Sequence, residues 1–296
     1  MQTTYAKLDI PLKLIVDIKI EDDHERASFQ LQNGDKVKGV LNLKPIELET
    51  IFGNITVGIE HINSIRIHQG DALAESVRKG LVLHYSFDHD EKEKISDRSG
   101  KENDGTIHGA KWTPKGKNRA AYVFDGVDDY IDMDLDSSIP KGIGKGSFAV
   151  AVWLKSQTPR SGPGYVIEQH IRGAPWTGIY LSVEPTNFRF RTDDTGGVPT
   201  SSALFDVSKI VDDEEWHHYV AVREDSVLYL YLDGVKKVEK RVPLVNLSAN
   251  YAGPLRMGAH CQDGKCANYN GAIDEVMIWN RALSEKEVEQ LYNSQK

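Results

Sequence analysis

Apolar and polar residues alternate in short stretches along most of this chain, with the period of two that belongs to a β-strand with one buried face. In the first part of the chain the alternation runs through residues 16–20 and 55–59. An Asn33-Gly34 pair between two further alternating stretches is typical of a tight hairpin turn. Several short strands and no convincing helix in residues 8–68 predict a small closed β-barrel, because closure removes the exposed edges of so short a sheet.

The alternation returns at residue 81 in longer stretches. Residues 148–154 alternate, and hairpin patterns follow at 179–191 and 216–232. Roughly ten strands at this spacing predict two packed antiparallel sheets, which is the arrangement of a jelly roll. A Ser-x-x-Glu capping box that begins at Ser284 predicts one short C-terminal helix.

These patterns define an all-β fold class with two domains. We expect a small β-barrel domain at 1–69, a linker at 70–80 and a jelly-roll sandwich at 81–296. The linker can form two helical turns, with Asp71 as the N-cap and Gly80 just after the last turn. A short helix of this kind would act as a semi-rigid spacer.

Charge and hydropathy exclude two classes of partner. The formal net charge is -8, whereas binding to nucleic acid draws its affinity from Lys and Arg. No stretch approaches the ~20 consecutive apolar residues that a membrane span needs. We therefore expect neither a nucleic-acid partner nor a membrane span.

The chain has two cysteines, Cys261 and Cys266, in a stretch rich in Gly and Asn. A disulfide between them is the favoured interpretation, and a loop this short would gain about 2 kcal/mol of stability from it. Free thiols are one alternative. Half of a zinc site with His260 is another, although a second pair of ligands is missing. A disulfide implies a secreted, periplasmic or cell-surface protein whose leader is absent from this numbering.

Three motifs carry a resemblance to a known family. They are Phe-Asp-Gly-Val-Asp-Asp-Tyr at 124–130, Trp-His-His-Tyr at 216–219 and Ile-Asp-Glu-Val-Met-Ile-Trp at 273–279. Together they resemble the laminin-G-like jelly roll of the concanavalin A-like lectin superfamily, over roughly residues 80–293. The segment before it is similar to small SH3- or Sm-like barrels. The resemblance implies a domain that binds rather than catalyses.

Calcium is the cofactor that the resemblance implies. Calcium takes oxygen ligands from carboxylates and carbonyls, and acidic loops lie at 87–105, 125–129 and 274–275. Laminin-G-like domains place one structural calcium among residues that match Asp88, Asp97, Asn103 and Asp274. The alternative is that these residues only form turns, and this is what we expect of the loop at 125–129. In a regular strand Glu275 would point away from Asp274.

A candidate ligand site lies between two strands of the second domain. Trp176 follows Gly and Pro in a loop and can offer an aromatic face to a sugar, while planar polar side chains nearby can bind hydroxyl groups. The candidate ligand-binding residues are His170, Arg172, Trp176, Tyr180, Arg189 and Arg191. The alternative is that Trp176 packs under its own loop.

No arrangement of residues indicates catalysis. A pair of carboxylates two residues apart on one strand is absent, as are nucleophile-elbow, phosphate-loop and dinucleotide motifs. We therefore expect a non-catalytic module that binds carbohydrate or an extracellular or cell-surface protein and holds a structural calcium. One alternative is a structural or adhesion component of a larger exported assembly. A glycosidase-type enzyme is the third hypothesis, and it requires two carboxylates on one concave face.

Overall fold

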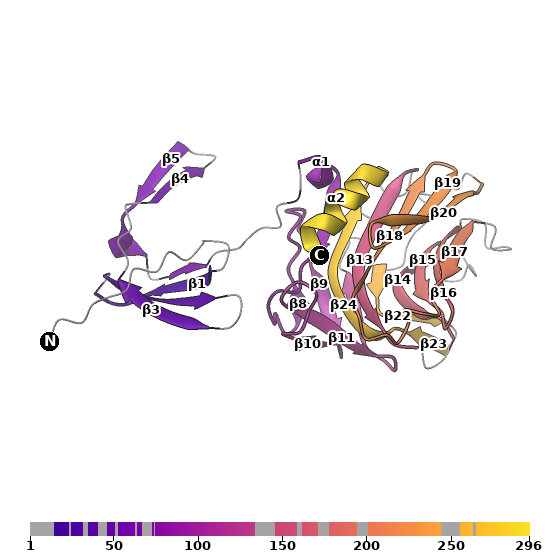
Figure 1. Cartoon of the computed structure of the whole chain (residues 1–296), viewed down its shortest axis with the longest axis horizontal. Helices are drawn as coiled ribbons and strands as arrows, with labels where there is room; N and C mark the ends of the chain where they lie inside the picture. Colours follow the sequence, from indigo (N-terminus) through magenta and orange to yellow (C-terminus); the bar gives the residue numbers. More distant parts are fainter. Residues whose placement is uncertain are drawn as a thin grey trace. The chain divides into compact units, whose positions relative to one another are not determined.

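The structure is a computed structural model, and the chain divides into two compact units, Met1–Ala72 and Leu73–Lys296 (Figure 1). Each unit is described by itself. The described residues are 15–23, 25–31, 35–40, 46–50, 53–62, 64–66, 73, 75–133, 146–158, 162–170, 178–193, 201–243, 255–262 and 265–296. Some of these are described by their backbone alone, namely 16, 46–50, 53–55, 59, 65, 66, 170, 193, 261, 262, 265 and 266.

The first unit contains a four-stranded antiparallel sheet and a separate hairpin. The sheet has the order β3 (Lys36–Val40), β2 (Arg26–Leu31), β1 (Ile15–Ile20) and β6 (Ser64–Arg66). The hairpin is β4 (Ile46–Thr50) and β5 (Gly53–Val57), followed by a 3₁₀ turn, η2 (Ile59–His61). Within the described part of this unit, β4 and β5 pair only with each other. The predicted closed barrel is therefore not confirmed, because alternation predicts strands but not which strands pair.

The second unit is a sandwich of two sheets, as the alternation predicts. In the described residues one sheet has eight strands: β7 (Leu81–Tyr85), β10 (Lys111–Thr113), β11 (Ala121–Asp125), β13 (Phe148–Ser156), β18 (His217–Glu224), β19 (Val227–Leu232), β20 (Val235–Arg241) and β24 (Asn270–Trp279). The other is a ten-stranded sheet: β8 (Lys94–Ile95), β9 (Gly105–His108), β12 (Tyr130–Met133), β14 (Gly164–His170), β15 (Gly178–Val183), β16 (Asn187–Asp193), β17 (Ser202–Asp206), β21 (Leu255–Met257), β22 (Ala259–Gln262) and β23 (Lys265–Asn268). The described strands pair antiparallel except for a parallel contact between β14 and β23.

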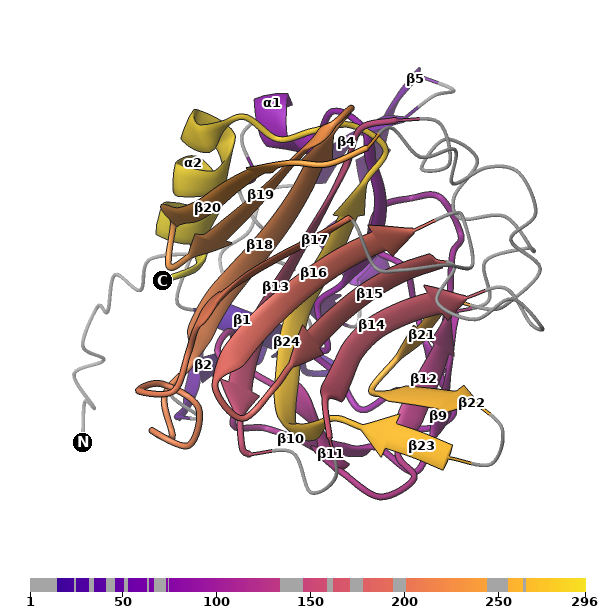
Figure 2. The same cartoon turned by 90° about the vertical axis from the view of Figure 1, so that its right-hand side faces the viewer.

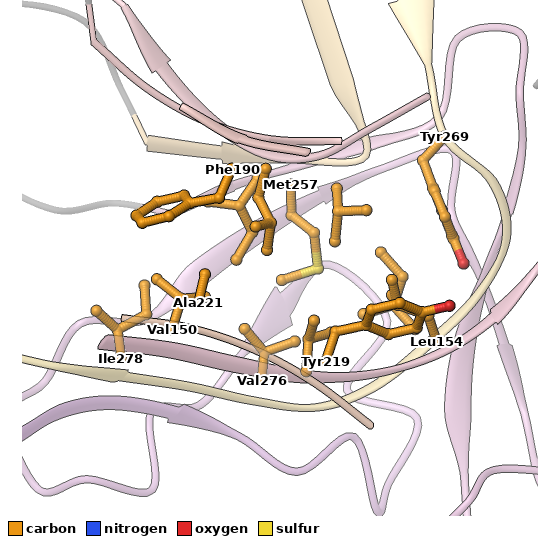
Figure 3. Packing of buried hydrophobic residues seen from close by; sticks show 14 of the residues in the cluster. Val150, Leu154, Phe190, Tyr219, Ala221, Met257, Tyr269, Val276 and Ile278 are labelled. Carbon is orange, nitrogen blue, oxygen red and sulfur yellow. The ribbon is translucent and has the colours of Figure 1, made fainter. Parts of the chain in front are cut away.

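The main core lies between the two sheets. Figure 3 shows Val150 and Ile278 of the eight-stranded sheet packed opposite Phe190 and Met257 of the ten-stranded sheet. All four side chains are buried, and Phe190 and Met257 are fully so. Alternate residues of each strand point into this layer, as in other two-sheet sandwiches. Burial of one such side chain contributes about 1.5–3 kcal/mol, so this layer determines the pairing of the sheets.

A second, smaller core covers the other face of the eight-stranded sheet. Helix α2 (Glu285–Gln295) buries Val288 and Leu291 against Ala149, Ala151 and residues of β18 and β24. This is why β13 is buried on both faces, although its sequence alone predicts one buried face. The predicted capping box is confirmed, because Ser284 and Glu287 each accept a hydrogen bond from the other's backbone N–H.

The predicted linker helix is a four-residue helix, α1 (Glu75–Arg78), followed by Gly80 at φ +77°. Its Val77 is buried in the second core, and the Val77 carbonyl accepts a hydrogen bond from Trp279 Nε1 at 2.6 Å. Within the second unit, α1 therefore packs on the sandwich and is not a free spacer. The predicted N-cap, Asp71, lies outside the described residues.

Candidate functional site

Polar side chains form one register row across the ten-stranded sheet, on the face turned away from the core. We call this face the polar face. Neighbouring strands pair these residues one after another: Ser202, Arg191, Tyr180, Glu168, Arg256, Asp132, Thr106 and Lys94. The residues on either side of them in each strand, such as Ile131 and Met257, point into the core. Figure 2 shows β14, β15 and β16 side by side, with the β22–β23 hairpin beside them.

One part of the polar face is buried and holds an imidazole and a carboxylate. His260 Nδ1 lies 3.1 Å from Glu168 Oε2, and Glu168 is 2% exposed. The His260 ring packs against Tyr165 and Tyr180, with ring centroids 4.7 Å and 5.8 Å away. The Arg191 guanidinium lies 5.5 Å from the Tyr180 ring. Aromatic and charged groups are thus fixed beside one another, in the way that polar groups orient a bound small molecule.

The other part of the polar face is more open and carries a stack of three planar groups, which we call the aromatic stack. The rings of His108 and Tyr130 lie 4.3 Å apart at 17°, and the Arg256 guanidinium lies 4.4 Å from the Tyr130 ring. Arg256 Nε also binds Asp132 Oδ1 at 2.8 Å. The side chains of His108 and Arg256 are 40% and 20% exposed. This part of the face can therefore meet a ligand with aromatic, cationic and carboxylate groups at once.

The structure brings together two of the six candidate ligand residues. Tyr180 and Arg191 are neighbours in the polar row. Arg189 lies two residues further along β16, where hydrogen bonds to Glu184 at 2.6 and 3.1 Å raise the pKa of its guanidinium. Trp176 and Arg172 lie outside the described residues, and of His170 only the backbone in β14 is described.

The sequence alone did not indicate Glu168, Arg256 or the aromatic stack as site residues, and it offered His260 only as a possible zinc ligand. The signal for Tyr130 and Asp132 was present, since both alternate with the core residues Ile131 and Met133. No such signal exists for His260. Its role comes from a hairpin that lies against β14, and only the three-dimensional structure gives that contact.

A second cluster lies at the predicted calcium position, where Asp274 and Glu275 are 0% and 1% exposed. Asn118 contacts both, since its backbone N–H donates to Asp274 Oδ2 and its Nδ2 donates to Glu275 Oε1, each at 2.8 Å. The expectation for a regular strand, in which Glu275 points away from Asp274, is therefore wrong for this pair. The cause is a β-bulge opposite Ala151–Trp153, with Glu275 at φ +49°, which turns the two carboxylates to the same side.

The electrostatics of this cluster are those of crowded buried carboxylates. Burial raises the pKa of Asp274 well above its usual range, and the charges of Glu275 and Asp88 raise it further. Backbone hydrogen bonds from Asn118 and Glu275 oppose that rise. Glu275 Oε2 is also 2.9 Å from His84 Nε2 and 3.2 Å from Gln295 Nε2. Buried carboxylates with like charge are costly, and a cation bound between them would relieve that cost.

The four predicted calcium ligands do not all share one role. The Asp88 carboxylate contacts Ser86 Oγ at 3.2 Å and Arg119 Nη1 at 3.6 Å. Its charge also raises the pKa of Asp274. The Asp97 carboxylate accepts backbone N–H bonds from His84, Ser99 and Asn103 at 2.9–3.1 Å, as expected of a turn former. Asn103 Nδ2 donates to the Val82 carbonyl at 2.7 Å. Among the other three predicted ligands, Asp88 is a residue whose charge acts on Asp274.

The two cysteines occupy directly opposite positions of the β22–β23 ladder, Cys261 facing Cys266. Opposite residues of antiparallel strands have Cα atoms about 4.5–5.5 Å apart, within the range of a disulfide. The side chains of both lie outside the described residues, and the disulfide stays a prediction. Among the helices that the structure describes, none has the length and apolarity to cross a membrane.

A two-sheet jelly roll with one core-averted polar face is the architecture of a lectin-like binding domain. A family model described as the concanavalin A-like lectin/glucanases superfamily matches residues 125–289, which is more than half of the chain. The chain therefore belongs to this superfamily, and the predicted resemblance of the second domain is confirmed.

Solved structures show the same fold at low sequence identity. The binding domain of Paraclostridial Mosquitocidal Protein 1 aligns with a TM-score of 0.57 and 18% identity, covering 74% of this chain and 53% of that one. Domain 4 of AbnA, an extracellular arabinanase from Geobacillus stearothermophilus solved with arabinotriose, aligns with a TM-score of 0.54 and 20% identity, covering 72% and 98%. The binding domain of botulinum neurotoxin DC, solved in complex with SialylT, aligns with a TM-score of 0.57 and 12% identity, covering 74% and 52%.

One curated relative is similar over part of the chain. Adhesion G-protein coupled receptor V1 of Danio rerio is 23% identical over 155 residues, which is 50% of this chain and 2% of the receptor. The chain thus spans a very small part of that receptor and about half of the toxin domains. These likenesses show the fold of the second unit alone.

Proposed function

We propose that the second unit is a non-catalytic carbohydrate-binding module and that the polar face is its binding surface. The observation that carries the proposal is the register row of polar residues, with the aromatic stack at its open part. A core-averted sheet face that only served solubility would not need buried aromatic rings and ion pairs. Tyr180 and Glu168 are 3% and 2% exposed on this face.

The chemistry of the polar face fits a saccharide. Sugar rings present C–H groups to aromatic faces, and their hydroxyl groups pair with planar polar side chains. Tyr130 and His108 offer such faces, while Arg256 and Asp132 offer a donor and an acceptor fixed at 2.8 Å from each other. A pre-formed arrangement of this kind lowers the cost of ordering side chains when a ligand binds.

The comparisons support a ligand of this class. The arabinanase domain was solved with arabinotriose and the botulinum domain with SialylT, and both have this fold. The adhesion receptor relative supports the second candidate, an extracellular or cell-surface protein partner. We extend the proposal to a secreted, periplasmic or cell-surface location, with a Cys261–Cys266 disulfide in the hairpin that carries His260.

We also propose a structural calcium held by Asp88, Asp274 and Glu275. Bound there, it would neutralise the crowded carboxylates and tie β24 to the loop after β7. Asn118 positions both carboxylates of the β24 pair through its backbone and side-chain amides. This role concerns stability, and the polar face lies on the other sheet.

The glycosidase hypothesis has weaker support. Glu168 and Asp132 lie two strands apart in the polar row, which corresponds to about 10 Å between their backbones. Retaining enzymes need about 5 Å between the two carboxyl groups and inverting ones about 6.5–9.5 Å. His260 binds Glu168 and Arg256 binds Asp132, so each carboxylate already has a cationic or imidazole partner. Both interactions favour a fixed binding surface over an acid–base pair.

A glycan array followed by titration calorimetry tests the proposal. The full chain should bind one class of oligosaccharide, and Tyr130→Ala should weaken that binding about two- to tenfold, because an aromatic contact contributes about 0.5–1.5 kcal/mol. The matched control is Tyr229→Ala, since Tyr229 is a half-buried tyrosine with Lys236 5.7 Å from its ring, on the other sheet. Full binding by Tyr130→Ala, or no glycan bound by the parent, would overturn the polar face as a sugar site.

A further inference from the structure

The turn between β11 and β12 gathers three carboxylates. Asp125, Asp128 and Asp129 each place one carboxylate oxygen within 4.8 Å of the others. Calcium binds oxygen at about 2.3–2.6 Å, so two of its ligands can be at most about 5 Å apart. The three carboxylates therefore lie close enough together to act on one calcium ion with only small side-chain movements.

Turn formation explains part of this loop but not the whole. Asp125 Oδ1 accepts the backbone N–H groups of Val127 and Asp128 at 2.8 and 3.4 Å, and Asp129 Oδ2 accepts that of Asp125 at 2.9 Å. Gly126 adopts φ +73° at the tip of the turn. These bonds use one oxygen each of Asp125 and Asp129 and none of the exposed Asp128 carboxylate. These hydrogen bonds within the turn do not by themselves indicate a metal site.

A buried amide on another strand gives the second, independent observation. Asn268 at the end of β23 is 4% exposed, and its Nδ2 donates to the carbonyl of Val127, which lies between Asp125 and Asp128. The other atom of the same amide, Oδ1, is buried and has no hydrogen-bond partner in the described part of the chain. A buried carbonyl oxygen without a partner is destabilising, and because the same amide contacts the acidic turn through Nδ2, a cation bound there would supply the missing partner.

We propose that this loop and Asn268 form a calcium site, separate from the one at Asp274. The donors are carboxylate and amide oxygens, the donor type that calcium prefers over transition metals. Three carboxylates gather within 4.8 Å of one another at this turn, and this concentration of negative charge favours a divalent cation.

The position of the site gives it a mechanical role. The loop joins β11 of the eight-stranded sheet to β12 of the ten-stranded sheet, and Asn268 ends the hairpin that brings His260 to Glu168. An ion here would therefore hold the hairpin and both sheets at one point. The consequence for ligand binding rests on the proposed function, but the site itself does not.

The test is calorimetric titration of calcium alone into the metal-stripped full chain. The parent should bind calcium at this site. Asp128→Asn should weaken that binding at least tenfold, because it removes one of three charged ligands and its exposed side chain is outside the core. The matched control is Glu289→Gln, which removes one negative charge from an exposed position of α2 and should bind as the parent does.

Three further variants test this site and separate it from its neighbour. Asp274→Asn should keep the calcium binding that depends on Asp128. Asn268→Leu should reduce that binding and Asn268→Asp should retain it, because aspartate restores an oxygen donor. Equal calcium affinity and stoichiometry in the parent and Asp128→Asn would overturn the proposal, as would a parent that binds no calcium. Loss of sugar binding alone would leave it intact.

Discussion

His218 predicts a defined acid sensitivity of the second unit. Its imidazole is 0% exposed, its ring centroid lies 5.0 Å from that of Trp153, and neither ring nitrogen has a hydrogen-bond partner in the described chain. The pKa of His218 is lowered from 6.5 to about 3, chiefly by burial; the charge of Asp233 opposes this fall, and the charge of Lys117 adds to it. The folded protein thus keeps His218 neutral, while the unfolded chain protonates it.

The sign and size of the effect follow from this difference. Because the folded pKa is depressed, the unfolded state binds more protons between pH 3 and 6.5, and stability falls as the pH falls through that range. Each pH unit below the unfolded pKa removes about 1.4 kcal/mol, so His218 alone removes about 2 kcal/mol between about pH 7.5 and about pH 5. For a unit of this size that corresponds to a fall in Tm of about 4–8 °C.

The perturbation is His218→Phe, which keeps an aromatic ring beside Trp153 and removes the titration. Any steric cost of the larger ring is independent of pH and shifts all values equally. Differential scanning calorimetry at several pH values should show a smaller loss of Tm on acidification in the variant, by about 4–8 °C. Parallel curves for the parent and the variant would refute the reasoning, since they would mean that His218 has the same pKa in both states.

Three further predictions concern single residues. His217, whose pKa is raised to about 9 chiefly by its hydrogen bond to an aspartate, contributes stability that is present below pH 6.5 and lost as the pH rises through 9. His217→Gln should therefore lose about 1–2 kcal/mol near pH 6 and almost nothing above about pH 10 in urea melts, and an equal loss at both would contradict the ion pair. Calcium at about 100 times its Kd should raise the Tm by about 5–10 °C. Asp274→Ala should lose the share of this Tm rise that comes from the site at Asp274. If calcium raises the Tm of Asp274→Ala as much as that of the parent, Asp274 is not a ligand. Non-reducing mass spectrometry should find Cys261 and Cys266 oxidised, and two alkylated thiols would contradict the disulfide.

The elements of the second unit were largely predictable, because local patterns determine them. The alternation in β13 places Phe148 and Val152 in the main core, and the structure confirms both as fully buried. The capping box at Ser284 predicts the start of α2, and the structure confirms that also. In each case the physical cause acts within a few residues, as a period of two or a side-chain-to-backbone hydrogen bond. Sequence is enough where the interaction is this local.

The polar face was not predictable, because it depends on pairing between strands distant in sequence. Glu168 is paired with Arg256 in the neighbouring strand, although strands β15–β20 lie between the two in the sequence. Arg256 is in turn paired with Asp132 in the strand on its other side. A slip of one residue in either pairing would turn Arg256 away from these partners. The sequence predicts that Arg256 alternates with core residues, but only the sheet order selects its neighbours. For that reason the candidate residues predicted from the sequence include Tyr180 and Arg191 of the polar face but not the residues beside them.

Irregular positions explain why the candidate cation sites escape prediction from periodicity. A regular strand would put Asp274 and Glu275 on opposite faces, and a bulge at φ +49° brings both to Asn118. The turn at Asp125–Asp129 likewise meets Asn268 only because β23 runs beside β14. Bulges and turns collect carboxylates that an alternating ladder would separate, and a bound cation would compensate for the repulsion. In this sandwich, acidic side chains therefore converge at bulges and turns, where the period of two is broken. The regular strands carry the residues of the core and of the polar face.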